Sequence, residues 1–344
     1  MIKVVVDCFG GDRSPQANVS GAIKALNKND DLYLILTGDE EKLQAELSSY
    51  TYDKTRLEIV HAPDVISCEE KPVEAIKKNK ESSLVKAYDL LRQNDDINAL
   101  VSTGSTGAVL VGSVLKIGRI KGVNRPAFCP ILPTMKETIV GICDSGANVD
   151  CDPINLVQFA IMGSLYLEKA YGIKNPRVAL LNIGTEEGKG DALRKETYDL
   201  LKENESINFV GNMESRDLLT GEYDLVVCDG FSGNVLLKST EGACMELMKL
   251  LKKKMTSGIK NKLGALLLKK SMYQVKDYMD YNNYGGGVML GTKKTIVKGH
   301  GSSKDTAIYH CINQAYNMEK SKLREYISDE ITKQTSEEKI TVSE

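Results

Sequence analysis

Short apolar runs followed by glycine-rich turns recur along this chain and restrict its fold more than any other feature. One such turn, DGFSGN at residues 229–234, directly follows the apolar run 223–228 and opens a long helical pattern. Similar turns follow other strand-like runs: DCFGGD at 7–12, STGSTGA at 102–108 and NIGTEEGKG at 182–190. Small residues at these places let backbone amides approach an anion. The pattern predicts an α/β enzyme that handles phosphate.

The strand-like runs alternate with helical patterns throughout the chain. Strands are expected near Val4 and at 33–36, 57–60, 99–102, 138–143, 178–183, 225–228 and 295–297. Continuous apolar strands separated by helices predict a mostly parallel sheet that is buried on both faces. Two helix starts are indicated by a capping residue followed by proline, Ser14 with Pro15 and Asp152 with Pro153.

The domain organisation follows from length and local composition. A chain of 344 residues with 42% hydrophobic content can build a large core in one or two α/β domains. We expect one catalytic unit of two lobes over residues 1–327. Three of the eight prolines fall in residues 126–133, which predicts a rigid crossover between the lobes. Residues 328–344 are polar and lack aromatic side chains, so we expect a disordered tail.

Several classes of protein are disfavoured by the sequence. A net charge of -2 argues against a nucleic-acid binder. Eight scattered cysteines without a CxxC pair indicate reduced thiols, and no signal-peptide pattern or membrane-length apolar run is present, so a cytoplasmic protein is expected. The chain has no GxxxxGK[ST] loop, no recognisable nucleophile triad and no clustered metal ligands. We therefore expect neither a metal nor a cofactor.

Two of the turns carry side chains that could bind a ligand or take part in catalysis. Lys189 stands between Gly188 and Gly190, which leaves its ammonium sterically open, and Glu186 and Glu187 are close enough in sequence to orient it. The turn GHGSSKD at 299–305 contains His300, and its serines could cap the next helix or donate to phosphate. Each glycine turn taken alone could also be purely structural, because every parallel sheet needs tight strand-to-helix turns.

Nine motifs in order resemble the PlsX family, the bacterial phosphate acyltransferases of phospholipid synthesis. They are DCFGGDRSP, STGSTGA, RPA at 125–127, DSGAN at 144–148, LLNIGTEEGKG, FVGNMES, DGFSGNVLLKSTEG, YGGG at 284–287 and KGHGSS. The resemblance covers most of the chain. It departs at Cys8 and Phe9, where the family tends to have alanine and methionine, and at Ser105, where asparagine is usual.

The resemblance implies a three-layer α/β/α fold with a mostly parallel sheet, related to isopropylmalate dehydrogenase and phosphotransacetylase, with a second lobe and a homodimeric assembly. It also implies that inorganic phosphate attacks the thioester of a fatty acyl-acyl carrier protein. The products would be acyl-phosphate and free carrier protein, and acyl-phosphate would pass to a membrane glycerol-phosphate acyltransferase. Such a reaction needs no protein nucleophile, because phosphate itself attacks and the enzyme supplies positioning and charge stabilisation.

By the resemblance, Lys189 and Asn234 are the catalytic residues. The lysine would bind phosphate or the departing thiolate, and the asparagine amide would donate to the developing oxyanion. The glycine-rich turns supply further candidates for phosphate binding: Gly10, Gly11, Asp12, Ser105, Thr106, Gly107, Ser232, Gly233, His300 and Ser302. Three alternatives stay open: a phosphotransacetylase-type enzyme that uses acyl-CoA, a non-catalytic phosphoester-binding scaffold, and a nicotinamide-dependent dehydrogenase, although no GxGxxG follows the first strand.

A lysine-rich segment predicts a helical arm over residues 247–281. Residues 247–276 contain nine lysines and no acidic residue, and Ile259, Leu263, Leu266 and Leu267 recur at helical spacing. An apolar helix face beside lysines is typical of peripheral contact with an anionic membrane. The same face could instead pack against the partner subunit, and the lysines could receive the acidic acyl carrier protein.

Overall fold

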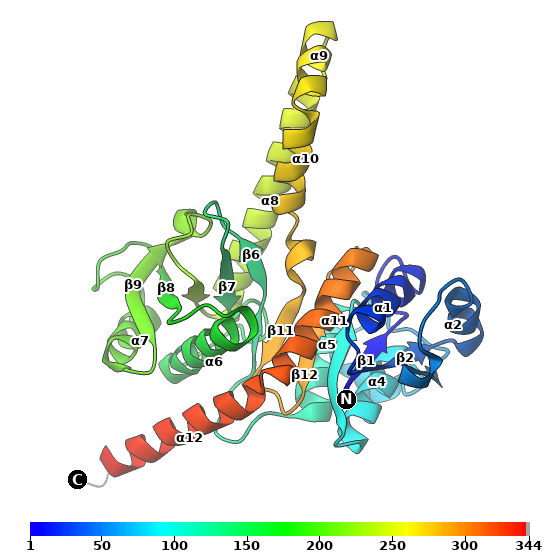
Figure 1. Ribbon diagram of the computed structural model, residues 1–344. Helices are drawn as coiled ribbons and strands as arrows, with labels where there is room; N and C mark the ends of the chain where they lie inside the picture. Colours follow the sequence, from blue (N-terminus) through cyan, green and yellow to red (C-terminus); the bar gives the residue numbers. More distant parts are fainter. Residues whose placement is uncertain (342–344) are drawn as a thin grey trace.

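Two β-sheets, each covered by helices, form the body of the molecule, and a helical hairpin projects from it (Figure 1). The structure is a computed structural model that describes the backbone of residues 1–341 and the side chains of residues 1–280 and 283–334. The first sheet has seven strands in the order β3 (Leu57–His61), β2 (Leu32–Gly38), β1 (Ile2–Asp7), β4 (Ile97–Ser102), β12 (Thr295–Lys298), β11 (Gly287–Leu290) and β5 (Ala127–Cys129).

The first sheet is the middle of three layers. Its described strands are parallel apart from β11, which runs antiparallel to β12 and β5. Val4 and Val6 of β1 pack in one apolar cluster with α1 (Gln16–Lys28) and α11 (Asp305–Lys320). Val5 points to the other face, toward α4 (Ser83–Gln93) and α5 (Thr106–Gly112). The predicted α/β/α layering and mostly parallel sheet are confirmed.

The second sheet has five strands in the order β6 (Ile131–Pro133), β7 (Ile139–Cys143), β10 (Leu225–Val227), β8 (Arg177–Asn182) and β9 (Asn208–Glu214). Within it β6 is antiparallel to β7, and the remaining pairs are parallel. Helices α6 (Pro153–Tyr171) and α7 (Ala192–Glu203) cover one face. The start of α8 (Gly230–Met255) covers the other through Leu236 and Leu237.

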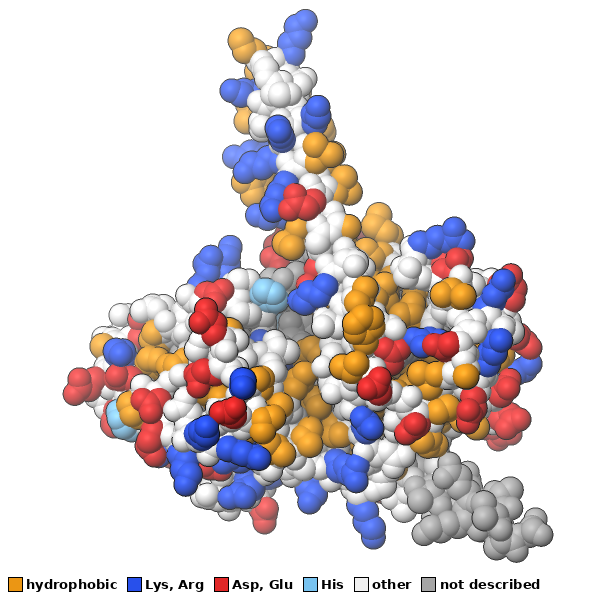
Figure 2. All heavy atoms as spheres, turned by 180° about the vertical axis from the view of Figure 1, so that it is seen from behind, with side chains coloured by type: hydrophobic (Ala, Val, Ile, Leu, Met, Phe, Trp, Pro, Cys, Tyr) orange, Lys and Arg blue, Asp and Glu red, His pale blue; other side chains and the backbone are white. Residues whose placement is uncertain are grey.

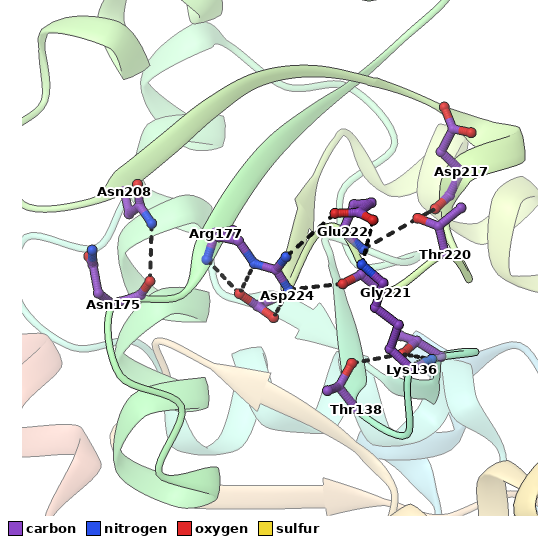
Figure 3. Close-up of polar contacts among 11 residues, drawn as sticks. Lys136, Thr138, Asn175, Arg177, Asn208, Asp217, Thr220, Gly221, Glu222 and Asp224 are labelled. Carbon is purple, nitrogen blue, oxygen red and sulfur yellow. Dashed lines mark hydrogen bonds and ion pairs between the residues drawn. The ribbon is translucent and has the colours of Figure 1, made fainter.

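An ion pair fixes the starting edge of the second sheet, opposite the glycine-rich turns (Figure 3). The Arg177 guanidinium donates from Nε to Asp224 Oδ2 at 2.9 Å and from a terminal nitrogen to Oδ1 at 2.8 Å. The Arg177 backbone N–H donates to the same carboxylate at 2.8 Å. Burial alone would raise the pKa of Asp224, but its hydrogen bonds with Arg177 hold it below the usual value. These contacts join the starts of β8 and β10.

The two lobes share one core. The chain passes from the first sheet to the second at Pro130, between β5 and β6, and returns at β11. A single apolar cluster runs from Val4 of the first sheet, through Phe159 and Tyr166 of α6, to Val227 of the second. The shorter elements are α2 (Glu40–Leu47), α3 (Pro72–Lys78), the 3-10 turns Lys54–Arg56, Ser215–Asp217 and Tyr281–Tyr284, and a π turn at Ser113–Ile117.

The projecting hairpin consists of the distal half of α8, α9 (Ile259–Leu267) and α10 (Lys269–Tyr278) (Figure 1). Figure 2 shows lysine and apolar side chains interspersed along it. Among the helices of the described residues, none has the length and hydropathy needed to cross a bilayer.

Two local predictions require correction. Helix α12 (Leu323–Thr341) occupies most of the segment expected to be disordered, because Ile327 and Ile331 are buried in the core beside α6; residues 342–344 lie outside the described part. Helix α1 begins at Gln16 with Pro15 as its N-cap residue, and the Ser14 hydroxyl donates instead to the Gly11 carbonyl at 2.7 Å. The start at Asp152 is confirmed: it forms a capping box with Asn155, and Pro153 is the first helical residue.

Candidate active site

A pocket of about 250 Å³ lies between the two lobes and collects residues from several glycine-rich turns. The first lobe contributes α5, β5 and the turns that flank β11 and β12. The second lobe contributes β6, the turn after β7 and the first turns of α8. The lining residues are Thr106, Leu110, Phe128, Pro130, Ile131, Leu132, Ser145, Gly146, Asn234, Leu237, Lys238, Glu241, Gly285, Gly286, Gly287, Lys298, Gly299 and His300.

The turns after β1, β4 and β12 meet at the carboxyl edge of the first sheet. The Asp12 N–H donates to the Gly301 carbonyl at 2.8 Å, and the Thr103 hydroxyl donates to the Gly10 carbonyl at 2.6 Å. A Cβ on Gly10 would lie 2.5 Å from the Gly104 nitrogen, so only glycine allows this approach. The strand order reverses between β1 and β4, where open α/β sheets commonly bind ligands.

Asp7 organises these turns from beneath. Its carboxylate accepts hydrogen bonds from the hydroxyls of Ser83 at 2.6 Å and Ser102 at 2.7 Å, and from the Phe9 N–H at 3.3 Å. Burial raises the pKa of this carboxyl, while the hydrogen bonds oppose the rise. Asp7 is therefore a structural acid whose bonding capacity is used within the loop cluster.

Lys298 ends β12 and brings a buried cation to the pocket. It is 6% exposed, and its ammonium donates to the Gly299 carbonyl. No ion pair to Lys298 is found among the described side chains. Burial lowers the pKa of Lys298 to about 8. Neighbouring ionisable groups have smaller effects on that pKa: Cys311, Cys68 and Asp7 raise it, and Lys238 lowers it.

The turn after β7 forms the facing wall. The buried Asp144 carboxylate accepts from the backbone N–H groups of Phe128 at 2.8 Å, Ala147 at 3.2 Å and Asn148 at 2.6 Å. Burial raises the pKa of Asp144, against the effect of these donors. The turn held in this way presents Ser145 to the pocket. The Ser145 hydroxyl is buried and has no hydrogen-bond partner within the described residues.

Asn234 reaches the pocket because α8 approaches the same turn closely. A Cβ on Gly233 would lie only 2.0 Å from the Asp144 carbonyl oxygen, so glycine is required there. One residue later, the Asn234 side chain stands 3.8 Å from where a Cβ on Gly146 would be. Gly233 thus has a packing role that places the Asn234 amide.

His300 enters the pocket as a neutral ring near pH 7. Burial lowers its pKa. Its Nδ1 accepts the Ser302 N–H at 3.2 Å and lies 2.9 Å from the Ser302 hydroxyl, which puts the proton of the neutral ring on Nε2. Ser302 therefore orients His300.

Lys189 lies outside this pocket, in the turn after β8. Its side chain is half exposed, and its ammonium stands 4.0 Å from Glu186 Oε1. The Lys189 carbonyl accepts from the Asn182 amide at 3.0 Å, which closes the turn. Nearby at the start of α8, the Ser232 hydroxyl donates to Asp229 at 2.8 Å and accepts from Arg194 at 2.9 Å. The Ser232 hydroxyl is thus used within the helix cap.

Of the residues predicted from the sequence, Thr106, Asn234 and His300 line the pocket. The other predicted catalytic and phosphate-binding residues do not line it: Gly10, Gly11, Asp12, Ser105, Gly107, Lys189, Ser232, Gly233 and Ser302. Sequence reasoning missed Lys298 and Ser145, although both lie in motifs that carry the family resemblance. In the described residues, no three or more His, Cys, Asp and Glu side chains cluster as metal ligands would.

Comparisons with known proteins agree with this architecture. The sequence model of a family described as "Fatty acid synthesis protein" matches residues 2–325. A phosphate acyltransferase of Clostridioides difficile (strain 630) is 44% identical over 338 residues, covering 98% of both chains. A phosphate acyltransferase of Clostridium acetobutylicum is 46% identical over 328 residues, covering 95% of this chain and 98% of the relative.

Solved structures with a similar fold include a phosphotransacetylase from Streptococcus pyogenes. It has a TM-score of 0.58 and 16% sequence identity, and the match covers 92% of this chain and 94% of that one. A branched-chain phosphotransacylase from Enterococcus faecalis V583 has a TM-score of 0.52 at 15% identity, covering 92% of this chain and 99% of the other. These likenesses establish the fold, which agrees with the one predicted.

Proposed function

Because this chain belongs to the fatty acid synthesis protein family and is a phosphate acyltransferase, we propose that its acyl donor is a fatty acyl thioester of acyl carrier protein and its acceptor is inorganic phosphate. The observation that carries this proposal is the two-sided lining of the pocket. The polar and charged lining residues include Lys298, His300 and Asn234, together with Thr106, Ser145, Lys238 and Glu241, and a separate apolar wall is formed by Leu110, Phe128, Ile131, Leu132 and Leu237. The polar groups suit phosphate and the thioester carbonyl, and the apolar wall suits the start of an acyl chain.

The reaction proceeds by direct attack. An oxygen of HPO₄²⁻ adds to the thioester carbonyl carbon, and the Asn234 amide stabilises the resulting oxyanion. The intermediate collapses as the carbon–sulfur bond breaks. The products are acyl-phosphate and the thiolate of the carrier, which takes the proton that phosphate releases, so charge and atoms balance. No cysteine lines the pocket, and Ser145 has no hydrogen-bonded base among the described residues, which favours phosphate as the nucleophile.

Lys189 is proposed to act on the thiol side of this reaction. Its half-exposed ammonium on the turn after β8 supports contact with the departing thiolate or the carrier rather than with an anion inside the pocket. The carrier is an acidic protein, so an exposed cation at the edge of the second sheet suits its approach. The acyl-CoA-dependent alternative differs only in the thiol carrier.

The arm is proposed to serve assembly and membrane contact together. Its tip exposes Ile259 by 81% and Leu267 by 86%, with Leu263 and Leu266 also exposed beside lysines. These residues would enter the surface of an anionic bilayer, so the enzyme would be peripherally membrane-associated. Nearer the body, α8 exposes Met245, Leu247, Leu250 and Leu251, which would pack against a second copy in a homodimer. A bound enzyme could deliver acyl-phosphate to a membrane glycerol-phosphate acyltransferase.

An assay of the purified protein tests the acyl donor. Palmitoyl-acyl carrier protein, palmitoyl-CoA and acetyl-CoA are each supplied with and without phosphate, and acyl-phosphate is trapped with hydroxylamine. We expect phosphate-dependent product from the long-chain carrier protein thioester, unchanged by EDTA. Equal or better turnover of acetyl-CoA would favour the phosphotransacetylase-type alternative. Isolation of a labelled acyl-enzyme on cysteine or serine would overturn the direct-attack mechanism.

A further inference from the structure

Lys298 is a buried cation without an anionic partner in the described part of the chain. Only 6% of the residue is exposed, and its ammonium has one hydrogen-bond acceptor there, the Gly299 carbonyl. An ammonium can donate three hydrogen bonds, and an unpaired buried charge destabilises a fold. Because Lys298 lines the pocket rather than the core, an anion in the pocket would supply the missing partner.

The Ser145 hydroxyl is a second, independent sign that a hydrogen-bonding ligand occupies this pocket. The residue is 4% exposed, and its hydroxyl is one of two buried side-chain polar atoms that lack a hydrogen-bond partner in the described structure. Its backbone is fixed, since the Ser145 N–H donates to the Phe128 carbonyl at 2.9 Å. The other such atom, the Thr197 hydroxyl, belongs to α7 and lies outside the pocket lining. Buried hydroxyls are normally satisfied, so the one in the pocket points to a ligand.

The backbone brings these two residues to one site from opposite lobes. Gly287 is paired with Lys298 across β11 and β12. A Cβ on Gly287 would lie 2.1 Å from the Phe128 ring, so glycine alone lets the β11 strand approach so closely. Phe128 in turn holds Ser145 through its carbonyl. Contacts through Gly287 and Phe128 therefore connect Lys298 in the first lobe with Ser145 in the second.

We infer that Lys298 and Ser145 bind the phosphate that attacks the thioester, which leaves Asn234 to bind the carbonyl oxygen. The inference rests on the proposed function and adds the phosphate-binding residues to it. Phosphate offers several acceptor oxygens around one centre, and these match an ammonium and a hydroxyl that approach from different lobes. The anion completes the bonding of both groups.

The experiment compares Lys298→Met and Ser145→Ala with wild type, and uses Thr197→Val as the matched control for loss of a buried unpaired hydroxyl. We expect Lys298→Met to raise the KM for phosphate roughly ten- to hundredfold, as loss of a charge-assisted hydrogen bond implies. Ser145→Ala should raise it by a smaller factor. The KM for the acyl donor should change less than twofold in both variants, and Thr197→Val should keep both constants.

A second readout needs no acyl donor. Wild-type protein and the three variants are melted with increasing inorganic phosphate, against potassium chloride at equal ionic strength. Wild type and Thr197→Val should be stabilised by phosphate, and Lys298→Met should lose that shift while melting no lower than wild type without phosphate. If Lys298→Met does not fold, Ser145→Ala decides the question. An unchanged phosphate KM and an unchanged phosphate-induced shift in the folded variants would overturn the assignment. Failure of wild type to use the carrier protein thioester would instead reject the proposed donor, and the melting series would still test this site.

Discussion

Replacing Gln314 with leucine would test how the pocket-lining turn 285–287 is held in place. Gln314 lies on α11 and is buried. Its side-chain oxygen accepts the Gly286 N–H at 2.8 Å, and its amide donates to the Gly286 carbonyl at 3.0 Å and to the Tyr166 hydroxyl at 2.5 Å. One side chain thus fixes both backbone groups of a glycine in the pocket and ties them to α6.

The expected loss of stability follows from these bonds. Leucine has a similar size but cannot form hydrogen bonds, so the partly buried N–H and carbonyl of Gly286 would lose their side-chain partner, and the Tyr166 hydroxyl would keep only the Tyr171 hydroxyl at 3.2 Å. Three well-formed hydrogen bonds at about 1 kcal/mol each give a decrease of about 3 kcal/mol in the free energy of unfolding. The released turn also moves relative to the reacting groups, and a displacement near 1 Å can lower kcat/KM by roughly a hundredfold.

Gln158→Leu provides the matched control. Gln158 is also buried, and it accepts the Asn124 N–H at 2.8 Å and donates to the Gly122 carbonyl at 3.0 Å, in a loop that does not line the pocket. Urea unfolding should show a loss of about 2 kcal/mol for two hydrogen bonds. The kcat/KM of this variant should stay near wild type. If both variants lose stability and activity in the same proportion, or if Gln314→Leu keeps full activity, the turn is not positioned by Gln314.

Four other perturbations have defined outcomes. The KM for phosphate, expressed as the concentration of HPO₄²⁻, should be steady below pH 8 and rise above it, because burial lowers the pKa of Lys298 to about 8 and the neutral amine attracts an anion weakly; a flat profile up to pH 10 would contradict this. Asn234→Ala should reduce kcat by roughly 10² to 10³ through loss of one oxyanion donor. Lys189→Ala should also reduce turnover sharply, and both variants should melt as wild type does. Near-normal kinetics in either variant would show that the residue is not catalytic. Leu266→Glu with Leu267→Glu should abolish flotation with anionic liposomes and leave turnover of soluble acyl carrier protein thioester largely intact, so unchanged flotation would reject the membrane contact.

The layered fold could be predicted from the sequence because most apolar runs are the segments that the structure buries as strands. The apolar runs 33–36 and 178–182 lie in the largely buried strands β2 and β8, whereas Ile183, expected at the end of the second run, lies beyond β8 and is 80% exposed. The short strand β5 has three residues, and β9 is partly polar, so neither has a distinct pattern. For α12 a signal existed: Leu323, Ile327 and Ile331 recur at helical spacing, but the surrounding polar composition suggested disorder.

The candidate site was less predictable because the sequence of a loop does not reveal whether a residue binds a ligand or packs within the protein. Gly10 and Gly233 resemble anion-binding glycines, yet both permit close backbone packing. Lys298 looks like an ordinary polar residue at the end of a strand, and only the tertiary fold buries it. Gln314 lies in the middle of a helix with no sequence signal, since its partners come from α6 and a turn 28 residues earlier.

Because α8 runs without a break from the pocket into the arm, the length of the arm can change without changing the pocket. The same helix carries Asn234 in the pocket and continues to Met255, and the chain returns through α10 to the body at Tyr281–Tyr284. An insertion of seven residues in each limb would lengthen the hairpin by about 10 Å and keep its apolar side chains on nearly the same face. Both ends of the hairpin would stay where they are. The distance between the arm tip and the pocket can therefore change in steps of two helical turns without altering any residue that lines the pocket.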